Sequence, residues 1–176
     1  MFRKWSFILV LIMCLSMMGC VNFGKLEHNK NIKIQQREIP NEILSYIIKQ
    51  DKMELYSMFS QEIKEVYDIE EELNIMFNNI PIDDFDVSQA EGHTNGEEIA
   101  YGDDGITELY FGYVYEYIYD SYGQEYIISF TYTSENQDNP DSIGIESLRI
   151  ASIERTNPNN RHSFRSVESF GAGLID

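Results

Sequence analysis

Cysteine is almost absent from this chain of 176 residues. Cys14 and Cys20 are its two cysteines, and both lie within the first twenty residues. Residues 21–176 therefore carry no thiol, which excludes a disulfide, a cysteine nucleophile and a cysteine-ligated zinc site from that part of the chain. Without such cross-links, we expect its stability to come from an apolar core.

Basic residues are also scarce. The chain has 13 Lys and Arg against 30 Asp and Glu, which gives a net charge of −17 at pH 7. A charge of this sign repels the phosphates of nucleic acids, and it equally repels anionic lipid headgroups. We therefore expect no nucleic-acid partner, and we expect that surface charge does not hold the protein at a membrane.

Motifs that specify a reaction are missing as well. The sequence contains no Walker loop, dinucleotide fingerprint, nucleophile elbow or H-E-x-x-H helix. His28, His93 and His162 are isolated from one another, and the acidic runs 83–86 and 103–105 do not complete a calcium-loop pattern. The sequence predicts no metal site and no cofactor.

The first twenty residues are the most distinctive segment that is present. Arg3 and Lys4 precede an apolar run over residues 7–18, and Gly19 stands directly before Cys20. This layout is typical of a secretory signal, and its end resembles the lipobox of bacterial lipoproteins.

The lipobox resemblance implies a signal peptide over residues 1–19, cleaved between Gly19 and Cys20, and lipidation of the Cys20 thiol. Residues 20–37 would then be a lipidated N-terminus and flexible tether, and the protein would be anchored on the extracytoplasmic face of the cell membrane. Met17 and Met18 depart from the residues that the lipobox prefers there. Two alternatives stay open: an uncleaved signal-anchor helix, although such helices need about 20 apolar residues, and plain secretory cleavage.

Residues 38–80 predict helices. Apolar side chains recur there at one-face helical spacing, and no Gly or Pro interrupts residues 41–80. Asp51 and Asp68 are each followed three residues later by a glutamate, which is the form of a capping box, and Ser60 marks a further start. We predict three or four short helices, with Pro81 preventing continuation of the last.

Beyond Pro81 the period becomes that of strands. We predict strands over 85–89, 108–119, 124–133 and 143–153, with a loop or irregular hairpin over 91–107. Residues 163–170 fit either a final strand or a turn of helix. Residues 38–176 therefore predict a single α+β domain, in which short helices cover one face of an antiparallel sheet over 82–153 and 154–176 form the C-terminal segment.

Four segments resemble one family: residues 51–60, 68–73, 126–132 and 139–150. With the lipobox, they are similar to an uncharacterised group of lipoproteins, a domain of unknown function from low-GC Gram-positive bacteria. The resemblance implies the cone-shaped fold of nuclear transport factor 2 and ketosteroid isomerase. In that fold a curved sheet wraps against helices and leaves a pocket at its wide end. The family brings no catalytic residues to this chain.

Aromatic side chains alternate along two predicted strands. Residues 111, 113, 115, 117 and 119 share one face if the period of two holds. A candidate pocket that stacks a sugar ring or a hydrophobic ligand is lined by Tyr113, Tyr115, Tyr117, Tyr126, Phe130 and Tyr132. The alternative is simple packing, because tyrosine is favoured on half-buried strands. Glu116 faces away from these tyrosines and is a weak catalytic candidate if its own face is buried.

The sequence therefore predicts a membrane-anchored extracytoplasmic lipoprotein that binds a small molecule or an envelope protein. Two alternatives stay open. One is an enzyme that uses the cone pocket for acid–base chemistry on a small hydrophobic substrate, and the other is a module for protein–protein association in the envelope. The sequence indicates neither the ligand nor an oligomeric state.

Overall fold

The computed structural model describes residues 31–102, 105–155 and 164–172. The chain divides into two compact units, residues 1–39 and 40–176. In the first unit the described residues, 31–39, are helical. Ile32 and Ile39 are seven positions apart, which places them on one face of a helix, but two apolar residues among polar neighbours predict a helix only weakly. The expected signal peptide and residues 20–30 of the tether lie outside the described residues.

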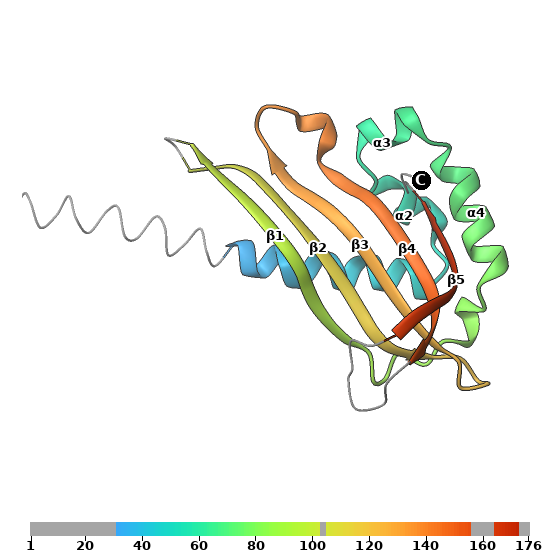
Figure 1. The fold of residues 1–176 in the computed structure, drawn as a ribbon. Coiled ribbons are helices and arrows are strands. Elements are labelled where there is room, and N and C mark those ends of the chain that lie inside the picture. The colour runs from blue at the N-terminus through green and yellow to red at the C-terminus, as the bar shows by residue number, and fades with distance from the viewer. Residues whose placement is uncertain (1–30, 103–104, 156–163, 173–176) are drawn as a thin grey trace, which may run out of the picture. The chain divides into compact units, whose positions relative to one another are not determined.

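The second unit is built on a five-stranded antiparallel sheet with the strand order β1-β2-β3-β4-β5. Each strand pairs with the next along the chain, so the sheet is a meander, and it is visibly curved (Figure 1). The strands are β1 (Glu91–Gly102), β2 (Gly105–Tyr119), β3 (Glu125–Asn136), β4 (Gly144–Arg155) and β5 (Phe164–Ala172). The expected α+β class with an antiparallel sheet is confirmed.

The helices of this unit precede the sheet. They are residues 40–48, α2 (Lys52–Ser57), α3 (Gln61–Val66) and α4 (Ile69–Asn79). All three predicted caps form. The side chains of Asp51, Ser60 and Asp68 each accept a hydrogen bond from the backbone N–H of the residue three positions later in the chain. After α4, Pro81 leads into a short 3₁₀ turn over Ile82–Asp84. No helix among the described residues is long and apolar enough to cross a membrane.

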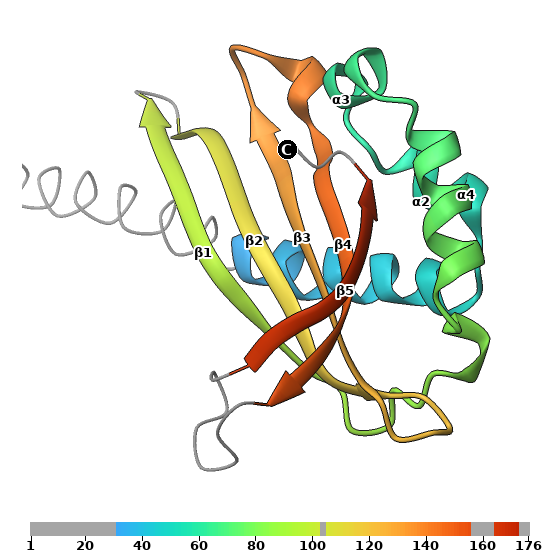
Figure 2. The ribbon, with the colours of Figure 1, turned by 45° about the vertical axis from the view of Figure 1, so that its right-hand side comes forward.

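The core lies between the helices and one face of the sheet. The helix of residues 40–48 crosses behind the strands in Figure 1, and Figure 2 shows α4 beside β5, with which it is in contact. We call this side the helix-covered face. Its most deeply buried side chains come from both layers: Ile43, Ile47, Leu55, Leu73 and Met76 from the helices, and Phe111, Ile118, Ile128, Leu148 and Ile150 from the strands.

The strand predicted over 85–89 does not form, so that prediction is wrong. Asp86 makes an isolated bridge with Tyr119, and its carboxylate accepts a hydrogen bond from the backbone N–H of Ser88 at 2.8 Å. An aspartate that bonds the backbone two residues ahead closes a local turn. This turn ends the extended structure after a single bridge.

Residues 91–102, for which the sequence predicts a loop or irregular hairpin, form the edge strand β1, which makes an irregular hairpin with β2. Glycine and glutamate have low strand propensity, but pairing along β2 overrides this preference. Gly96 adopts a φ of +92° at a bulge between Thr94 and Glu97, and bulges of this kind are common in edge strands. At the other edge, β5 shows that residues 164–172 are a strand rather than a turn of helix.

A second bulge, in β2, changes the face of the sheet on which the later aromatic residues of this strand lie. Tyr115 pairs with Ile128 and Ile118 pairs with Tyr126, so β2 has one more residue in this interval than β3. Tyr117 lies in the bulge with a φ of +62°. Because of the additional residue, Tyr117 faces away from the helix-covered face, which Tyr115 and Ile118 share. The expected period of two therefore ends at Tyr115.

Candidate functional site

Three residues of the predicted aromatic pocket meet on the helix-covered face. The rings of Tyr113 and Phe130 stack with their centres 5.8 Å apart, and the rings of Tyr113 and Tyr115 are 5.1 Å apart at 57°. Gly92 on β1 makes room for them, because a Cβ atom there would lie 2.6 Å from the Tyr115 ring and 2.7 Å from the Tyr113 hydroxyl. The cluster therefore depends on a glycine in the neighbouring strand.

The helix of residues 40–48 covers this cluster. The Tyr115 hydroxyl donates a hydrogen bond to Oδ1 of Asn41 at 3.1 Å, and burial raises the pKa of the Tyr115 phenol, with the neighbouring Tyr113 adding to the shift. Burial likewise raises the pKa of Tyr132, to which the charge of Glu42 contributes. These phenols stay neutral and pack against the helix.

The other two members of the predicted pocket lie elsewhere. The Tyr126 ring packs against that of Phe85 at a tilt of 42°, with ring centres 4.7 Å apart, and its hydroxyl donates to Asp120 at 3.2 Å. Tyr117 lies on the opposite face of the sheet, where the Arg155 guanidinium is 4.7 Å from its ring centre. The six residues therefore do not converge on one cavity.

Glu116 is buried, with 6% of its surface exposed. It faces away from Tyr115, as the alternation predicted, but it shares with Tyr117 the face of the sheet that carries Arg155. The hydrogen bond that the Arg155 guanidinium donates to Glu125 is the main cause of the raised pKa of Arg155, and the charges of Glu125, Tyr117 and Glu116 contribute. Arg155 and Glu125 form an ion pair, and the charge of Glu116 acts on Arg155 from nearby. No inward carboxylate joins the tyrosine cluster from this position.

The acidic loop residues are engaged in local structure. The Asp84 carboxylate accepts hydrogen bonds from the backbone and hydroxyl of Ser121, and Asp86 bonds Ser88 as described above. Within the described ranges, no three His, Cys, Asp or Glu side chains gather as metal ligands. Asp103 and Asp104 of the second acidic run lie outside those ranges.

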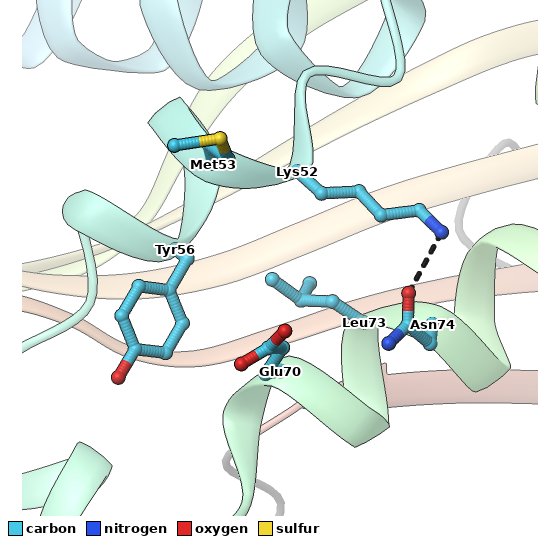
Figure 3. Close-up of a pocket in the computed structure, with 6 residues that line it drawn as sticks. All are labelled: Lys52, Met53, Tyr56, Glu70, Leu73 and Asn74. Atoms are coloured by element: carbon cyan, nitrogen blue, oxygen red, sulfur yellow. Dashed lines mark hydrogen bonds between the residues drawn. The ribbon is translucent and has the colours of Figure 1, made fainter.

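A groove of about 470 Å³ opens between α2 and α4. It is lined by Lys52, Met53, Tyr56, Glu70, Leu73 and Asn74 (Figure 3). Leu73 is buried and forms the floor, whereas Met53 is 84% exposed and Tyr56 is 39% exposed. Exposed apolar side chains around an apolar floor are typical of a binding surface.

The caps of two helices position the polar side chains of the groove. Asp51 fixes the start of α2 immediately before Lys52, and Asp68 fixes the start of α4 two residues before Glu70. The Lys52 ammonium donates to Oδ1 of Asn74 at 2.8 Å. In Figure 3 the Lys52–Asn74 pair lies at one end of the groove, Tyr56 and Glu70 lie toward the other end, and Leu73 lies between them.

A shallower hollow of about 250 Å³ lies on the other face of the sheet. Its polar lining includes Ser129, Ser147 and Arg149 together with Thr131, whose hydroxyl is 2.8 Å from that of Ser147. Gly112 on β2 permits the close approach of β1 beside this hollow, because a Cβ atom there would lie 2.6 Å from the Asn95 carbonyl oxygen. The two hollows differ in polarity: the groove between α2 and α4 has an apolar floor, whereas the hollow on the sheet has the polar lining just described.

The α2–α4 groove is not predicted by the sequence. Leu55, Met58 and Phe59 form the apolar stripe that the helical spacing of α2 predicts to be buried. Met53 and Tyr56 lie outside this stripe, and the sequence predicts no function for them. One feature of the sequence does point to an exposed apolar surface on α2: these two large apolar residues are three positions apart and lie outside the stripe. That signal does not reveal the position of α4, which supplies the other wall.

Comparison with known families covers most of the second unit. A family model described as "Domain of unknown function (DUF5104)" matches residues 42–155, which extend from the helix of residues 40–48 to the end of β4 and include every residue of the groove. No curated protein matches the chain. The expectation that the chain belongs to an uncharacterised family is thus confirmed, and the chain belongs to the DUF5104 family.

Proposed function

We propose that this protein is a lipid-anchored binding module on the extracytoplasmic face of the cell membrane. The support for the anchor is the N-terminal sequence, in which a basic start and an apolar run lead to Gly19 and Cys20. An acidic chain gains little from anionic headgroups, so a covalent diacyl anchor on Cys20 supplies the membrane attachment. The partners are the membrane, through this anchor, and a small-molecule ligand.

The fold is, in this proposal, a relative of the nuclear transport factor 2 cone. The curved antiparallel meander with helices on one face supports this assignment. Ile43 and Ile47 of the helix of residues 40–48 are fully buried, and Asn41 bonds Tyr115 of the sheet. Because this helix packs onto the tyrosine cluster, the ligand site is assigned to the α2–α4 groove.

The groove is the observation that carries the binding proposal. Its volume falls within the range of about 300–1,000 Å³ that is usual for small-molecule sites, and its floor is apolar. Met53 leaves most of its surface in water without a ligand, and burying such a side chain favours binding. Glu116, the buried carboxylate on β2, lies away from both the groove and the cluster of Tyr113, Tyr115 and Phe130, so no acid–base reaction is assigned.

The test is a ligand screen by thermal unfolding, using the mature lipidated chain in lipid nanodiscs. A ligand at about 100 times its dissociation constant stabilises the folded state by about 2.7 kcal/mol. We expect saturable stabilisation that is lost in the groove variants Met53→Glu and Tyr56→Ala. Tyr122→Ala, which removes a side chain that is 92% exposed on a distant turn, is the matched control.

Two results would contradict the proposal. A stabilising ligand whose effect survives both groove variants would place the site elsewhere. A screen without any saturable stabilisation, combined with recovery of one envelope protein by cross-linking to the groove, would favour a protein partner instead.

A further inference from the structure

We infer that the α2–α4 groove recognises a short apolar peptide by both of its charged termini. The inference rests on the proposed binding function and names the ligand class for that groove. Its basis is the placement of one acidic and one basic side chain toward opposite ends of an apolar floor (Figure 3). A ligand that satisfies both ends carries a cation and an anion separated by an apolar body.

The acidic end is formed by Glu70 and Tyr56. Glu70 lies in the first turn of α4 and is exposed, and among the residues that the structure describes none makes a hydrogen bond or ion pair with its carboxylate. Tyr56 presents its ring beside this carboxylate in Figure 3. A carboxylate next to an aromatic ring is a favourable site for an ammonium group.

A neighbouring lysine limits how the Tyr56 ring can be used. The Lys64 ammonium lies 4.9 Å from the ring centre and donates to the backbone oxygen of Ser57 at 3.2 Å. Burial lowers the pKa of Lys64. Lys64 therefore occupies one face of the Tyr56 ring, and the ligand ammonium contacts Glu70 rather than that face.

The basic end is formed by Lys52 and Asn74. An ammonium group has three donors, and Lys52 uses one of them on Oδ1 of Asn74. That bond fixes the orientation of the Asn74 amide, so its NH₂ group points away from Lys52 and is a further donor. Two kinds of N–H donor at one end of the groove suit a carboxylate, which accepts through both of its oxygens.

The middle of the groove selects an apolar body. Leu73 is 1% exposed and forms the floor, and Met53 borders the groove on α2. Methionine adapts its shape to different apolar partners, so the site accepts various aliphatic side chains. The termini then determine the orientation, with the amino terminus at Glu70 and the carboxyl terminus at Lys52.

The experiment uses three probes: the tripeptide Leu-Leu-Leu, its N-acetylated form and its C-terminal amide. Binding of each is measured by isothermal titration calorimetry to the mature chain in nanodiscs. Each modification removes one terminal charge, and we expect each to weaken binding about threefold to tenfold, as for a charge-assisted contact at a partly exposed site.

Two variants assign each terminus to its side chain. In Glu70→Gln, acetylation should no longer weaken binding, whereas amidation still should. In Lys52→Gln the pattern should reverse. Glu98→Gln on β1 and Lys49→Gln, two exposed positions outside the groove, make the same changes in net charge and should leave both effects intact.

The outcomes separate this inference from the binding proposal itself. If both modifications weaken binding equally in the wild type and in both groove variants, Glu70 and Lys52 do not bind the charged termini of the peptide, and the inference is wrong. If the screen finds neutral ligands whose binding is abolished by Met53→Glu, the groove binds but does not select zwitterions. If Leu-Leu-Leu gives no heat at millimolar concentration, the ligand is not a short apolar peptide.

Discussion

The Nζ atom of Lys52 on α2 donates a hydrogen bond to Oδ1 of Asn74 on α4 across 2.8 Å. The same ammonium lies 5.6 Å from the centre of the Phe77 ring. One side chain therefore connects the two helices that form the walls of the groove. Because the contact is partly buried, it stabilises the fold as well as the shape of the groove.

A double-mutant cycle measures this contact. We expect Lys52→Met and Asn74→Ala each to lower the free energy of unfolding by about 0.5–1.5 kcal/mol, and the double variant to lose less than the sum. Urea unfolding followed by circular dichroism gives the values. The control cycle combines Asn74→Ala with Lys49→Met, for which the effects should add. Additivity in the first cycle would show that the Lys52–Asn74 bond does not couple the helices.

Gly144 is expected to be intolerant of substitution. Its φ is +134°, and a Cβ atom would lie 2.6 Å from the backbone nitrogen of Ser60 and 2.7 Å from the carbonyl oxygen of Met58. At this point Ile145 exchanges backbone hydrogen bonds with Met58 and Ser60, at 2.8 and 3.0 Å. Gly144→Ala should therefore lower the free energy of unfolding by more than about 2 kcal/mol.

Gly123→Ala is the matched control for Gly144. Gly123 also has a positive φ, +80°, but no atom lies within 4 Å of the position that a Cβ atom would take there. We expect a loss of about 1 kcal/mol, caused by the backbone conformation alone. Equal losses at both positions in chemical unfolding would mean that the close approach of β4 to the α2–α3 connection adds no constraint.

The cap of α4 is testable by a pair of substitutions. The Asp68 side chain accepts a hydrogen bond from the Glu71 N–H at 3.2 Å. Asp68→Ala should lower the free energy of unfolding by about 1 kcal/mol, whereas Asp68→Asn should retain most of the stability because asparagine is an equally good N-cap. Thermal unfolding compares the two variants. A full loss in Asp68→Asn would indicate that the carboxylate charge, rather than the cap, is needed.

The buried phenol of Tyr115 makes stability sensitive to high pH. Burial raises its pKa in the folded state, whereas a tyrosine in the unfolded chain titrates near pH 10. As pH rises above about 10, the unfolded state loses this proton first, so stability is complete below pH 10 and is lost above it. Tyr115→Phe should make the loss between about pH 10 and 11.5 shallower.

Urea unfolding at a series of pH values measures this slope. Tyr122→Phe serves as the control, because the Tyr122 side chain is almost fully exposed and its replacement should leave the wild-type slope unchanged. A slope in Tyr115→Phe that equals the wild-type slope would mean that the buried phenol does not contribute to alkaline unfolding.

The lipid anchor is tested by Cys20→Ala. Without the thiol no diacylglyceryl group can be attached, so we expect the variant to leave the membrane fraction or to accumulate as an unprocessed precursor. Fractionation and metabolic labelling with a radioactive or alkynyl fatty acid provide the measurement. Unchanged membrane attachment without label in either protein would favour the uncleaved signal-anchor helix.

Local sequence signals predicted the helices and most strands correctly. The caps at Asp51, Ser60 and Asp68 form as expected, because a cap depends on residues only three positions apart. The strands β3 and β4 follow from apolar alternation for the same reason. For residues 91–107 the sequence left a loop and an irregular hairpin open, because the stability of edge strand β1 comes from hydrogen bonds to β2 and not from its own composition.

The candidate site could be predicted only in part. Tyr113, Tyr115 and Phe130 do meet on one face of the sheet, as alternation within two strands requires. Tyr117 does not join them, because the bulge in β2 inserts one additional residue and so breaks the alternation of side chains between the two faces. A bulge depends on the register between two strands, and a single strand's sequence does not reveal that register.

By itself, the sequence determined the short-range features of this protein: the capped helices, the α+β order, the acidic character and a domain without thiols. Tertiary structure alone decided which side chains became neighbours. The groove brings Lys52 and Tyr56 of α2 to Glu70 and Asn74 of α4, and the tyrosine cluster brings Asn41 to Tyr115. These contacts depend on how packed helices and paired strands cross, and that geometry is set by burial of the shared core rather than by any one segment.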